Sequence, residues 1–580
     1  MRYKESQLID NDTRLQLMDD NNSEDWVDGS TRPPRALTFC RKSLLGGLVC
    51  ALVLLGMAIG AWITPPIAIN GRLAEQAKSS ITTTSGPAPR NIIMMISDGM
   101  GPASVSFSRT FYQYIHGLPY DHEMPLDTIH VGQSRTRSSS TLVTDSAAGA
   151  TAFSCGLKTY NGAIGVDPKK NPCGTVLESA KYHRGMRTGL VATSRITHAT
   201  PASFSAHVTD RDNENAIAIQ QIGDYRLGRS LDLMFGGGYC HFLPKSDQRS
   251  CRKDERNLFK EANEKFGWEH VLSIDHNRTE FDALPDNASV LPVFGLFHPD
   301  HMNYEIDRDP ALEPSLTEMT DKALKILSSS AEQSDEEDKG FFLMVEGSRI
   351  DMAAHSNDPV AHLHDILEYQ NTIELVKRFV DEHPDTLLIS TSDHETGGLS
   401  LARQVTSAYP KYLWYPDVLI KATQSTVALA NKIKAQASVT HDFLIKEILQ
   451  KGLGIGDPTK DELDRLLNIG SKKRLDQYLA EMISIRAQLG WATHGHSGVD
   501  VNLYAYGAQA DSLRGSHENI EIGEFIARML NLDLNELTTM LNEDNDGFSL
   551  ETLSDNDKKE YTNMLDTYHS NPKNLHHPSY

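Results

Sequence analysis

Residues 91–101 read NIIMMISDGMG, a short apolar run that ends in an acid on a glycine-containing turn. An apolar run of this length is typical of a strand that is buried on both faces of a sheet. Asp98 follows the run directly, so we expect its carboxylate at the carboxyl end of the strand. Alone, this acid is weak evidence for a site, and its meaning depends on what the rest of the chain places beside it.

Similar runs recur along the chain and alternate with helical stretches. The other predicted strands are residues 189–194, 233–235, 341–346, 387–392 and 503–506. Asp358 followed by Pro359 predicts the start of one helix, and Ser315-x-x-Glu318 predicts a capping box that opens another. This alternation predicts an α/β fold with a mostly parallel central sheet flanked by helices, with ligands at the carboxyl ends of the strands.

The charge balance restricts the partners of the protein. The 580 residues include 78 acidic and 56 basic side chains, for a formal net charge of −22. A nucleic-acid binder needs a basic surface, so no nucleic-acid partner is expected. An anionic substrate remains compatible with this charge, because bound metal ions can dominate the local field.

An uncharged run over residues 43–63 is long enough to cross a bilayer as a helix. Four basic residues precede it with no acid among them, which predicts a cytoplasmic N-terminus by the positive-inside rule. They are Arg32, Arg35, Arg41 and Lys42. The long tail before the run and Pro65-Pro66 after it favour an uncleaved signal anchor over a cleaved signal peptide. We therefore expect a single-pass type II membrane protein.

Composition divides the rest of the chain. Residues 1–42 are polar and acidic and are expected to be a disordered cytoplasmic tail. Residues 64–89 resemble a linker, and residues 90–535 form the predicted catalytic domain. Within this domain, residues 420–490 are predicted to be a helical insertion, and Thr459-x-x-Glu462 predicts the start of one of its helices. Residues 536–580 are a polar tail that processing could remove.

Cysteines and sequons agree with a lumenal catalytic domain. Outside the membrane region the cysteines are Cys155, Cys173, Cys240 and Cys251. Four cysteines allow three pairings, and proximity in sequence favours Cys155–Cys173 and Cys240–Cys251, as suits an oxidising compartment. Asn277 and Asn287 begin glycosylation sequons, which are frequent enough by chance that they only agree with this topology.

Acids and histidines gather after the predicted strands. They are Asp98, then Glu346 with Asp351-x-x-x-His355, then Asp393-His394, and lastly His494-Gly495-His496 before the 503–506 strand. A helix through Asp351 and His355 would place both on one face. Histidine nitrogens and carboxylate oxygens are zinc ligands, and a carboxylate-rich third site with a hydroxyl would suit Mg²⁺. The combination predicts a metal centre that no single cluster would establish.

Residues 143–151, VTDSAAGAT, place Ser146 at the expected start of a helix rich in small residues. The first amides of a helix lack internal partners and form an anion site with the helix dipole. A serine-capped packing helix is the simpler interpretation of these residues alone. Given the metal-ligand clusters, the nonapeptide instead resembles the phosphorylated-serine signature of the alkaline phosphatase family, at every position.

The resemblance extends from about residue 91 to residue 530 and is strongest to the fungal vacuolar, repressible branch of that family. It implies that one zinc ion is held by Asp351, His355 and His496, with His494 as the alternative to His496. It implies that the second zinc ion is held by Asp98, Asp393 and His394, with Ser146 as the nucleophile. It implies that Mg²⁺ is held by Asp98, Thr200 and Glu346.

The substrate side of the site is carried over in the same way. Arg211, in the sequence HVTDR, matches the arginine that grips the phosphate in the family. We expect Asp145 to orient Arg211 through a charge-assisted hydrogen bond. His198 stands where the bacterial enzymes carry an aspartate and the animal enzymes a histidine, and Met352 stands where the bacterial enzymes carry a lysine. These two departures leave the identity of the third metal open.

The resemblance implies an enzyme of broad specificity that hydrolyses phosphate monoesters through a phosphoserine intermediate. It further implies a homodimer with two Zn²⁺ and one Mg²⁺ in each subunit. It also implies a vacuolar membrane location with the catalytic domain in the lumen, although topology alone allows the cell surface equally. Two alternatives are weighed: a related diesterase or sulfatase, and an inactive ectodomain. The chain lacks the C-x-P-x-R motif of sulfatases, and none of the expected ligands is missing.

Overall fold

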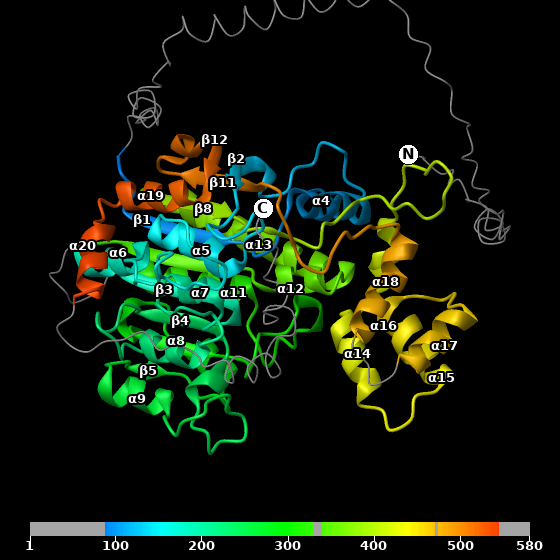
Figure 1. Cartoon of the computed structure of the whole chain (residues 1–580), viewed down its shortest axis with the longest axis horizontal. Coiled ribbons are helices and arrows are strands. Elements are labelled where there is room, and N and C mark those ends of the chain that lie inside the picture. The colour runs from blue at the N-terminus through cyan, green and yellow to red at the C-terminus, as the bar shows by residue number, and fades with distance from the viewer. Residues whose placement is uncertain (1–86, 330–338, 470–473, 544–580) are drawn as a thin grey trace, which may run out of the picture. The chain divides into compact units, whose positions relative to one another are not determined.

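A ten-stranded sheet organises residues 87–329, 339–469 and 474–543, the parts of the chain that the computed structural model describes (Figure 1). The predicted tail, anchor and most of the linker lie outside these residues, as does nearly all of the predicted C-terminal tail. Within the described ranges, no helix combines the length and the hydropathy that crossing a membrane requires.

The order of the strands across the sheet mixes early and late segments of the chain. From one edge to the other it is β12 (Gly515–Glu518), β2 (His130–Arg135), β11 (Val501–Gly507), β8 (Thr386–Thr391), β1 (Asn91–Ile96), β7 (Phe341–Glu346), β3 (Arg187–Arg195), β4 (Leu233–Gly237), β6 (Val293–Leu296) and β5 (His270–Val271). A separate two-stranded ribbon pairs β9 (Glu395–Thr396) with β10 (His496–Ser497). All six predicted strands are present.

Within the large sheet, only β11 runs against its neighbours, β2 and β8. The central strands β8, β1, β7, β3, β4 and β6 pair in parallel. Because β11 is reversed, it begins at the edge where the parallel strands end. Residues just before β11 therefore lie at the same edge as Asp98, and the predicted mostly parallel α/β fold is confirmed.

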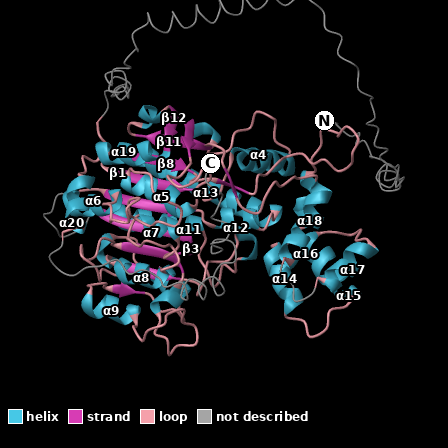
Figure 2. Ribbon diagram, viewed as in Figure 1, coloured by secondary structure: helices cyan, strands magenta, loops and turns pink. Residues whose placement is uncertain are grey.

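Helices connect the strands and cover both faces of the sheet (Figure 2). The α-helices are α4 (Pro102–His116), α5 (Ser146–Cys155), α6 (Val176–Arg184), α7 (Ala199–Ser203), α8 (Glu214–Gln221), α9 (Leu258–Lys265), α10 (Asn277–Ala283), α11 (Leu316–Ser328), α12 (Arg349–His355), α13 (Pro359–Glu382), α14 (Thr426–Lys434), α15 (His441–Phe443), α16 (Lys451–Leu453), α17 (Lys460–Asn468), α18 (Leu475–Ala487), α19 (Asn519–Met529) and α20 (Leu534–Leu541). The segment η6 (Leu444–Gln450) is a π-helix.

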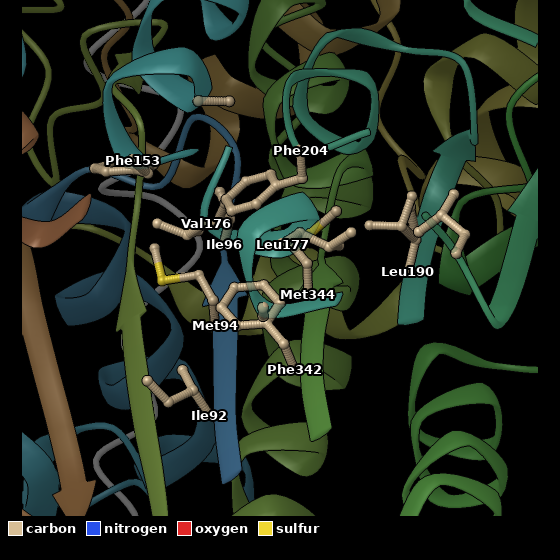
Figure 3. Close-up of a cluster of buried hydrophobic side chains, with 14 of the residues drawn as sticks. Ile92, Met94, Ile96, Phe153, Val176, Leu177, Leu190, Phe204, Phe342 and Met344 are labelled. Carbon is tan, nitrogen blue, oxygen red and sulfur yellow. The ribbon is translucent and has the colours of Figure 1, made fainter. Parts of the chain in front are cut away.

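Strand β1 shows why the apolar run has no polar residue inside it. Its alternating side chains enter two cores: Ile92, Met94 and Ile96 pack on one face, where α5, α6 and α19 also contribute (Figure 3). Ile93 and Met95 pack on the other face, against α11 and α13. Both faces of the strand exclude water, so every position inside it favours an apolar side chain.

Helix starts occur where the capping residues predict them. Asp358 caps α13 by accepting hydrogen bonds from the amides of Val360 and Ala361. Ser315 and Glu318 form the capping box of α11, and Thr459 with Glu462 forms that of α17. These signals are local, because the capping side chain and the amides it satisfies are within three residues of each other.

Helices α14 to α18 surround a third core that is separate from the sheet. Their buried side chains pack with apolar residues of α4 and of the first turns of α13, among them Phe107, Phe111 and Leu363. This helical region follows the ribbon strand β9 and leads back toward β10, so the chain leaves the sheet after the Asp393-His394 pair and returns before His496.

Both predicted disulfides, Cys155–Cys173 and Cys240–Cys251, are present. The glycosylation predictions differ in outcome. Asn277 is 8% exposed and its amide donates to the carbonyl of Leu296, so the folded protein does not present this side chain to a glycan. This burial opposes the prediction for Asn277. Asn287 is exposed and remains a prediction.

Candidate active site and metal centre

Three neighbouring strands bring acids to one edge of the sheet. Strands β8, β1 and β7 lie side by side, and each is followed or ended by a carboxylate. Asp98 comes two residues after β1, Asp393 comes two residues after β8, and Glu346 is the last residue of β7. All three are fully buried. Ligands in α/β sheets bind at this edge, as the sequence pattern predicts.

Ser146 is the first residue of α5 and is fully buried. Asp145 is the cap of this helix, because its Oδ1 accepts a hydrogen bond from the amide of Ala148. Gly149 allows the helix to approach the metal-ligand candidates: a Cβ there would lie 3.0 Å from the Cβ of Asp393. The small residues of the nonapeptide therefore let the serine reach the carboxylates.

Ser146 contacts the first group of candidate ligands. Its Oγ lies 3.1 Å from Nε2 of His394 and 3.5 Å from Oδ1 of Asp98. His394 Nε2 is in turn 3.2 Å from Oδ2 of Asp393 and 3.4 Å from Oδ1 of Asp98. One nitrogen and two carboxylate oxygens converge beside a hydroxyl, which is a donor set suited to zinc.

The second group consists of Asp351, His355 and His496. His355 Nε2 lies 3.3 Å from Asp351 Oδ2 and 3.2 Å from His496 Nε2, and His496 Nε2 lies 3.8 Å from Asp351 Oδ1. The rings of His394 and His496 stack with centroids 3.5 Å apart, so the two groups adjoin. His494 differs from His496, because its Nδ1 bonds the carbonyl of His355 instead of facing the carboxylates.

A third, oxygen-only set lies beside the first. Thr200 Oγ1, Glu346 Oε1 and Asp98 Oδ2 are buried, and within the described residues none of these three atoms has a well-aligned hydrogen-bond partner. Thr200 lies in the short helix α7, which follows His198. Buried polar atoms without partners are costly, and oxygen donors are the ligands that Mg²⁺ prefers. The set therefore fits a hard cation.

The electrostatics of the site also favour bound cations. Burial and the adjacent carboxylates of Asp393 and Asp351 raise the pKa of Asp98 well above its usual value. Burial raises the pKa of Glu346 to about 7. Burial and the neighbouring His394 lower the pKa of His496 to about 3, so its ring is neutral and can offer a lone pair. Buried carboxylates this close require compensating positive charge.

Arg211 comes from a separate segment and contacts Asp145, the residue before Ser146. Its Nη1 lies 3.1 Å from Oδ2 of Asp145, and its Nη2 lies 3.0 Å from Nε2 of His198. Burial and the positive charge of Arg211 lower the pKa of His198 well below its usual value, so the ring is neutral and accepts the hydrogen bond. The guanidinium is held on two sides, which fixes its plane.

Some contacts of the site were not anticipated from the sequence. The ring of His301 lies edge-on to His198, with centroids 5.1 Å apart, and the guanidinium of Arg195 lies 2.8 Å from His301 Nε2. Thr396 donates a hydrogen bond to Asp351. Met352 has an arginine beside it, since Arg349 Nη1 lies 2.9 Å from its sulfur. These residues carry no local motif, and only the fold brings them to the site.

A buried serine at a helix start, two carboxylate–histidine groups and a fixed arginine define a metal-dependent hydrolase of phosphate esters. The chain belongs to the alkaline phosphatase family, which it matches over residues 89–532. It is accordingly an enzyme that hydrolyses phosphate monoesters, and the family is metal-dependent.

Known relatives agree with this assignment. An alkaline phosphatase of Schizosaccharomyces pombe is 48% identical over 454 residues, which cover 78% of this chain and 83% of the relative. The repressible alkaline phosphatase of Saccharomyces cerevisiae is 44% identical over 540 residues, which cover 89% of this chain and 92% of the relative. The crystal structure of a cold-active alkaline phosphatase from Shewanella superposes with a TM-score of 0.63 at 32% identity, covering 76% of this chain and 99% of the other.

Proposed function

We propose that this enzyme hydrolyses phosphate monoesters of broad specificity through a phosphoserine on Ser146, at a site for two zinc ions and one magnesium ion. The observation that carries the proposal is the position of the Ser146 hydroxyl, which is 3.1 Å from His394 and 3.5 Å from Asp98, within one of two adjoining ligand groups. Burying several carboxylates beside one hydroxyl costs stability, so their presence around Ser146 supports a chemical role for this serine.

The residues present fit the proposed metals. Asp351, His355 and His496 would hold one zinc ion, and Asp98, Asp393 and His394 the other. Asp98, Thr200 and Glu346 would hold Mg²⁺, and three of their oxygens are buried without a well-aligned hydrogen bond from the part of the chain that the structure describes. When bound, the metals would lower the pKa of the serine hydroxyl and stabilise negative charge on the leaving oxygen.

The chain's own groups then have defined roles. Ser146 Oγ gives its proton to water and attacks phosphorus, so that a bond from phosphorus to Oγ forms while the bond to the ester oxygen breaks, and the departing alcohol takes a proton from water. In the second half a water oxygen attacks phosphorus and the bond to Oγ breaks, and a proton from that water passes to Oγ, which restores the serine hydroxyl and releases inorganic phosphate. Arg211 binds two oxygens of the phosphoryl group, and the amino end of α5 faces its negative charge.

The membrane anchor, the vacuolar location and the homodimer are part of the proposal. The uncharged run over residues 43–63, with basic residues before it, supports a type II anchor that places the catalytic domain in the lumen of the vacuole or, as the alternative, at the cell surface. Protease protection of the intact organelle distinguishes these locations. Sedimentation of the purified enzyme tests for the dimer.

The nucleophile is tested by Ser146→Ala. We expect the variant to bind its metals but to form no phosphoenzyme, because the attacking oxygen is missing. Acid quenching after mixing with radiolabelled phosphate ester measures the covalent species, and elemental analysis measures the metals. Undiminished labelling of the variant would refute the assignment. Turnover of an aryl monoester, diester and sulfate by the native enzyme tests the substrate class.

A further inference from the structure

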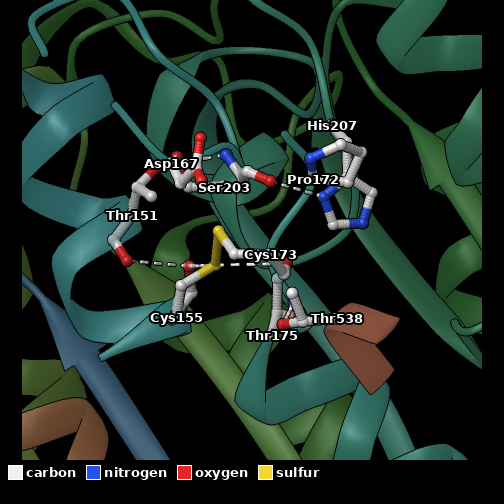
Figure 4. Close-up of a disulfide and its surroundings, with 12 residues drawn as sticks. Thr151, Cys155, Asp167, Pro172, Cys173, Thr175, Ser203, His207 and Thr538 are labelled. Atoms are coloured by element: carbon white, nitrogen blue, oxygen red, sulfur yellow. Dashed lines mark hydrogen bonds between the residues drawn. A yellow bond between two sulfur atoms is a disulfide. The ribbon is translucent and has the colours of Figure 1, made fainter. Parts of the chain in front are cut away.

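The segment that joins α5 to α6 is closed by a disulfide and lies against the groups that hold the phosphate-binding arginine. We name residues 156–173 the disulfide loop. Cys155 is the last residue of α5, the helix that begins with Ser146, and its bond to Cys173 ties the end of the loop to the end of this helix (Figure 4). The loop therefore starts and finishes on the nucleophile helix.

The loop is bound to the middle of α5 as well. Thr151 Oγ1 donates to the carbonyl of Ala163 and accepts from the amide of Gly165, at 3.0 and 3.1 Å. Thr151 and Ala163 are fully buried, so water cannot readily replace these bonds. The loop is thus held by a covalent bond at one end and by buried hydrogen bonds further along.

The same loop pairs with residues 207–211, the segment that carries Arg211. Ile164 and Val208 exchange two backbone hydrogen bonds, at 3.0 and 3.1 Å. The hydroxyl of Tyr160 donates to the carbonyl of Thr209 at 2.9 Å. The amide of Arg211 itself donates to the carbonyl of Gly162 at 2.9 Å. The backbone position of the arginine is therefore set by the loop.

Gly162 contacts both members of the arginine–aspartate pair. Its carbonyl accepts from Arg211, and its amide donates to Oδ2 of Asp145 at 2.9 Å. That oxygen is the one that accepts from Nη1 of Arg211. Gly162 has a φ of 91°, a conformation that side chains rarely adopt, so glycine is needed to point the two groups in these directions.

We infer that the disulfide loop positions Arg211 and Asp145 for phosphate, and that Tyr160 and Gly162 are positioning residues of this enzyme. The inference rests on the proposed role of Arg211. A long side chain such as arginine loses freedom when it binds, and a fixed backbone and a fixed carboxylate reduce that loss. The metal ligands lie on other segments, so the loop acts on phosphate affinity and not on metal binding.

The first test is Tyr160→Phe, which removes one hydrogen bond to the arginine segment and preserves the ring. We expect the dissociation constant for inorganic phosphate, measured by calorimetry on the metal-loaded enzyme, to rise about 3- to 10-fold. Zinc content should stay unchanged. Tyr506→Phe is the matched control, because its hydroxyl bonds the surface residue Asp381, and it should leave phosphate affinity unchanged. A parallel loss of zinc in Tyr160→Phe would overturn the inference.

Coupling to the arginine separates positioning from general stability. In the Arg211→Ala background, Tyr160→Phe should have no further effect on phosphate affinity, because the group it positions is gone. Full additivity of the two effects, or no effect of Tyr160→Phe alone, would overturn the inference and leave the role of Arg211 intact. Unchanged phosphate affinity in Arg211→Ala would instead refute the proposed role of the arginine, and the inference with it.

The disulfide provides a second variant pair. Replacing Cys155 and Cys173 by serine should weaken phosphate binding, whereas replacing Cys240 and Cys251 should not, since the amides of Cys240 and Cys251 bond the carbonyls of Pro299 and Cys240 and not the loop. Removing either bond lowers stability, so the comparison is made on folded protein of equal zinc content. Equal phosphate affinity in the two double variants would contradict a positioning role of the disulfide loop. If the variant without Cys155 and Cys173 does not fold, the result for Tyr160→Phe decides whether the loop positions Arg211.

Discussion

At the scale of single residues, Asp145 combines two structural tasks with separate oxygens. Oδ1 caps α5 through the amide of Ala148, and Oδ2 accepts from Arg211 and from the amide of Gly162. The negative charge of Asp145 therefore serves to orient Arg211, whereas capping α5 requires only an oxygen that accepts a hydrogen bond. Asp145 precedes α5 and Ser146 begins it, so the first side chain contacts Arg211 and the second contacts His394.

We expect Asp145→Ala to weaken the binding of inorganic phosphate about 10- to 100-fold, since a hydrogen bond to a charged group contributes about 1.5–3 kcal/mol. The inhibition constant for phosphate measures the effect. Asp145→Asn keeps an oxygen for the cap, so it should retain more thermal stability than the alanine variant while still binding phosphate weakly. Unchanged inhibition by phosphate in both variants would contradict this account.

At the scale of elements, the cap of α13 is unusually well satisfied. Asp358 is fully buried and accepts from the amides of Val360 and Ala361 and from the amide and hydroxyl of Thr426, so it also joins α13 to the helical region. We expect Asp358→Ala to lower the free energy of unfolding by about 1–3 kcal/mol. The exposed cap of α17 offers a comparison, and Thr459→Ala should cost no more than about 1 kcal/mol. Denaturant melts measure both, and equal losses would contradict the role given to burial.

A buried ion pair anchors the start of residues 207–211. His207 Nε2 lies 3.0 Å from Oε1 of Glu178, and its Nδ1 bonds the carbonyl of Gly165. Burial favours the neutral ring, but the attraction of Glu178 and the hydrogen bonds to Glu178 and Gly165 outweigh it and raise the pKa of His207 above 6.5. The same pair keeps the pKa of Glu178 low despite its burial. The histidine should therefore stay charged to a higher pH in the folded protein than in the unfolded chain.

This pair makes a pH-dependent contribution to stability. A raised histidine pKa stabilises the fold fully below the unfolded value of about 6.5 and loses that effect as the pH rises through the folded value. The difference in melting temperature between the native enzyme and His207→Gln should therefore be larger at pH 6 than at alkaline pH. Comparing the two proteins at each pH separates the effect of His207 from that of the other titrating groups. A melting-temperature difference that stays constant from pH 6 to alkaline pH would contradict a raised pKa of His207.

At the scale of the whole molecule, the metal centre joins segments that are far apart in the chain. Its candidate ligands come from residues 98 to 496: most end or follow strands of the large sheet or lie in the helices after them, and His496 lies in the ribbon strand β10. Metal ions that bind the native state alone add about 4 kcal/mol of stability at a free concentration a thousand times the dissociation constant. We expect chelation to lower the melting temperature and zinc with magnesium to restore it.

The sheet should survive that removal, because its two cores consist of apolar side chains and include none of the candidate ligands. Circular dichroism of the chelated enzyme should thus show native secondary structure at room temperature. Calorimetry with and without chelator measures the melting temperature. Identical melting curves would show that the buried acids need no cation for stability, which would count against the metal fit.

Local signals made much of this fold predictable. The six predicted strands, the caps at Asp358 and Ser315 and the turn at Asp98 each depend on residues that are close in sequence. The short strands β5, β6 and β12 escaped prediction because two to four residues carry too little periodicity, and β2 escaped because its polar, half-exposed residues form no apolar run. The reversal of β11 also escaped, since strand direction depends on how the preceding segment crosses the sheet.

Sequence by itself therefore determined the α/β class, the identity of the chemically capable residues and the helix that presents Ser146. Only the tertiary structure decided that His496 and not His494 faces Asp351, that Asn277 is buried, and that Gly162 lies between Arg211 and Asp145. The physical reason is the range of the interactions involved. Capping and periodicity act over a few residues, whereas the choice between two histidines or the position of a guanidinium depends on segments tens to hundreds of residues away.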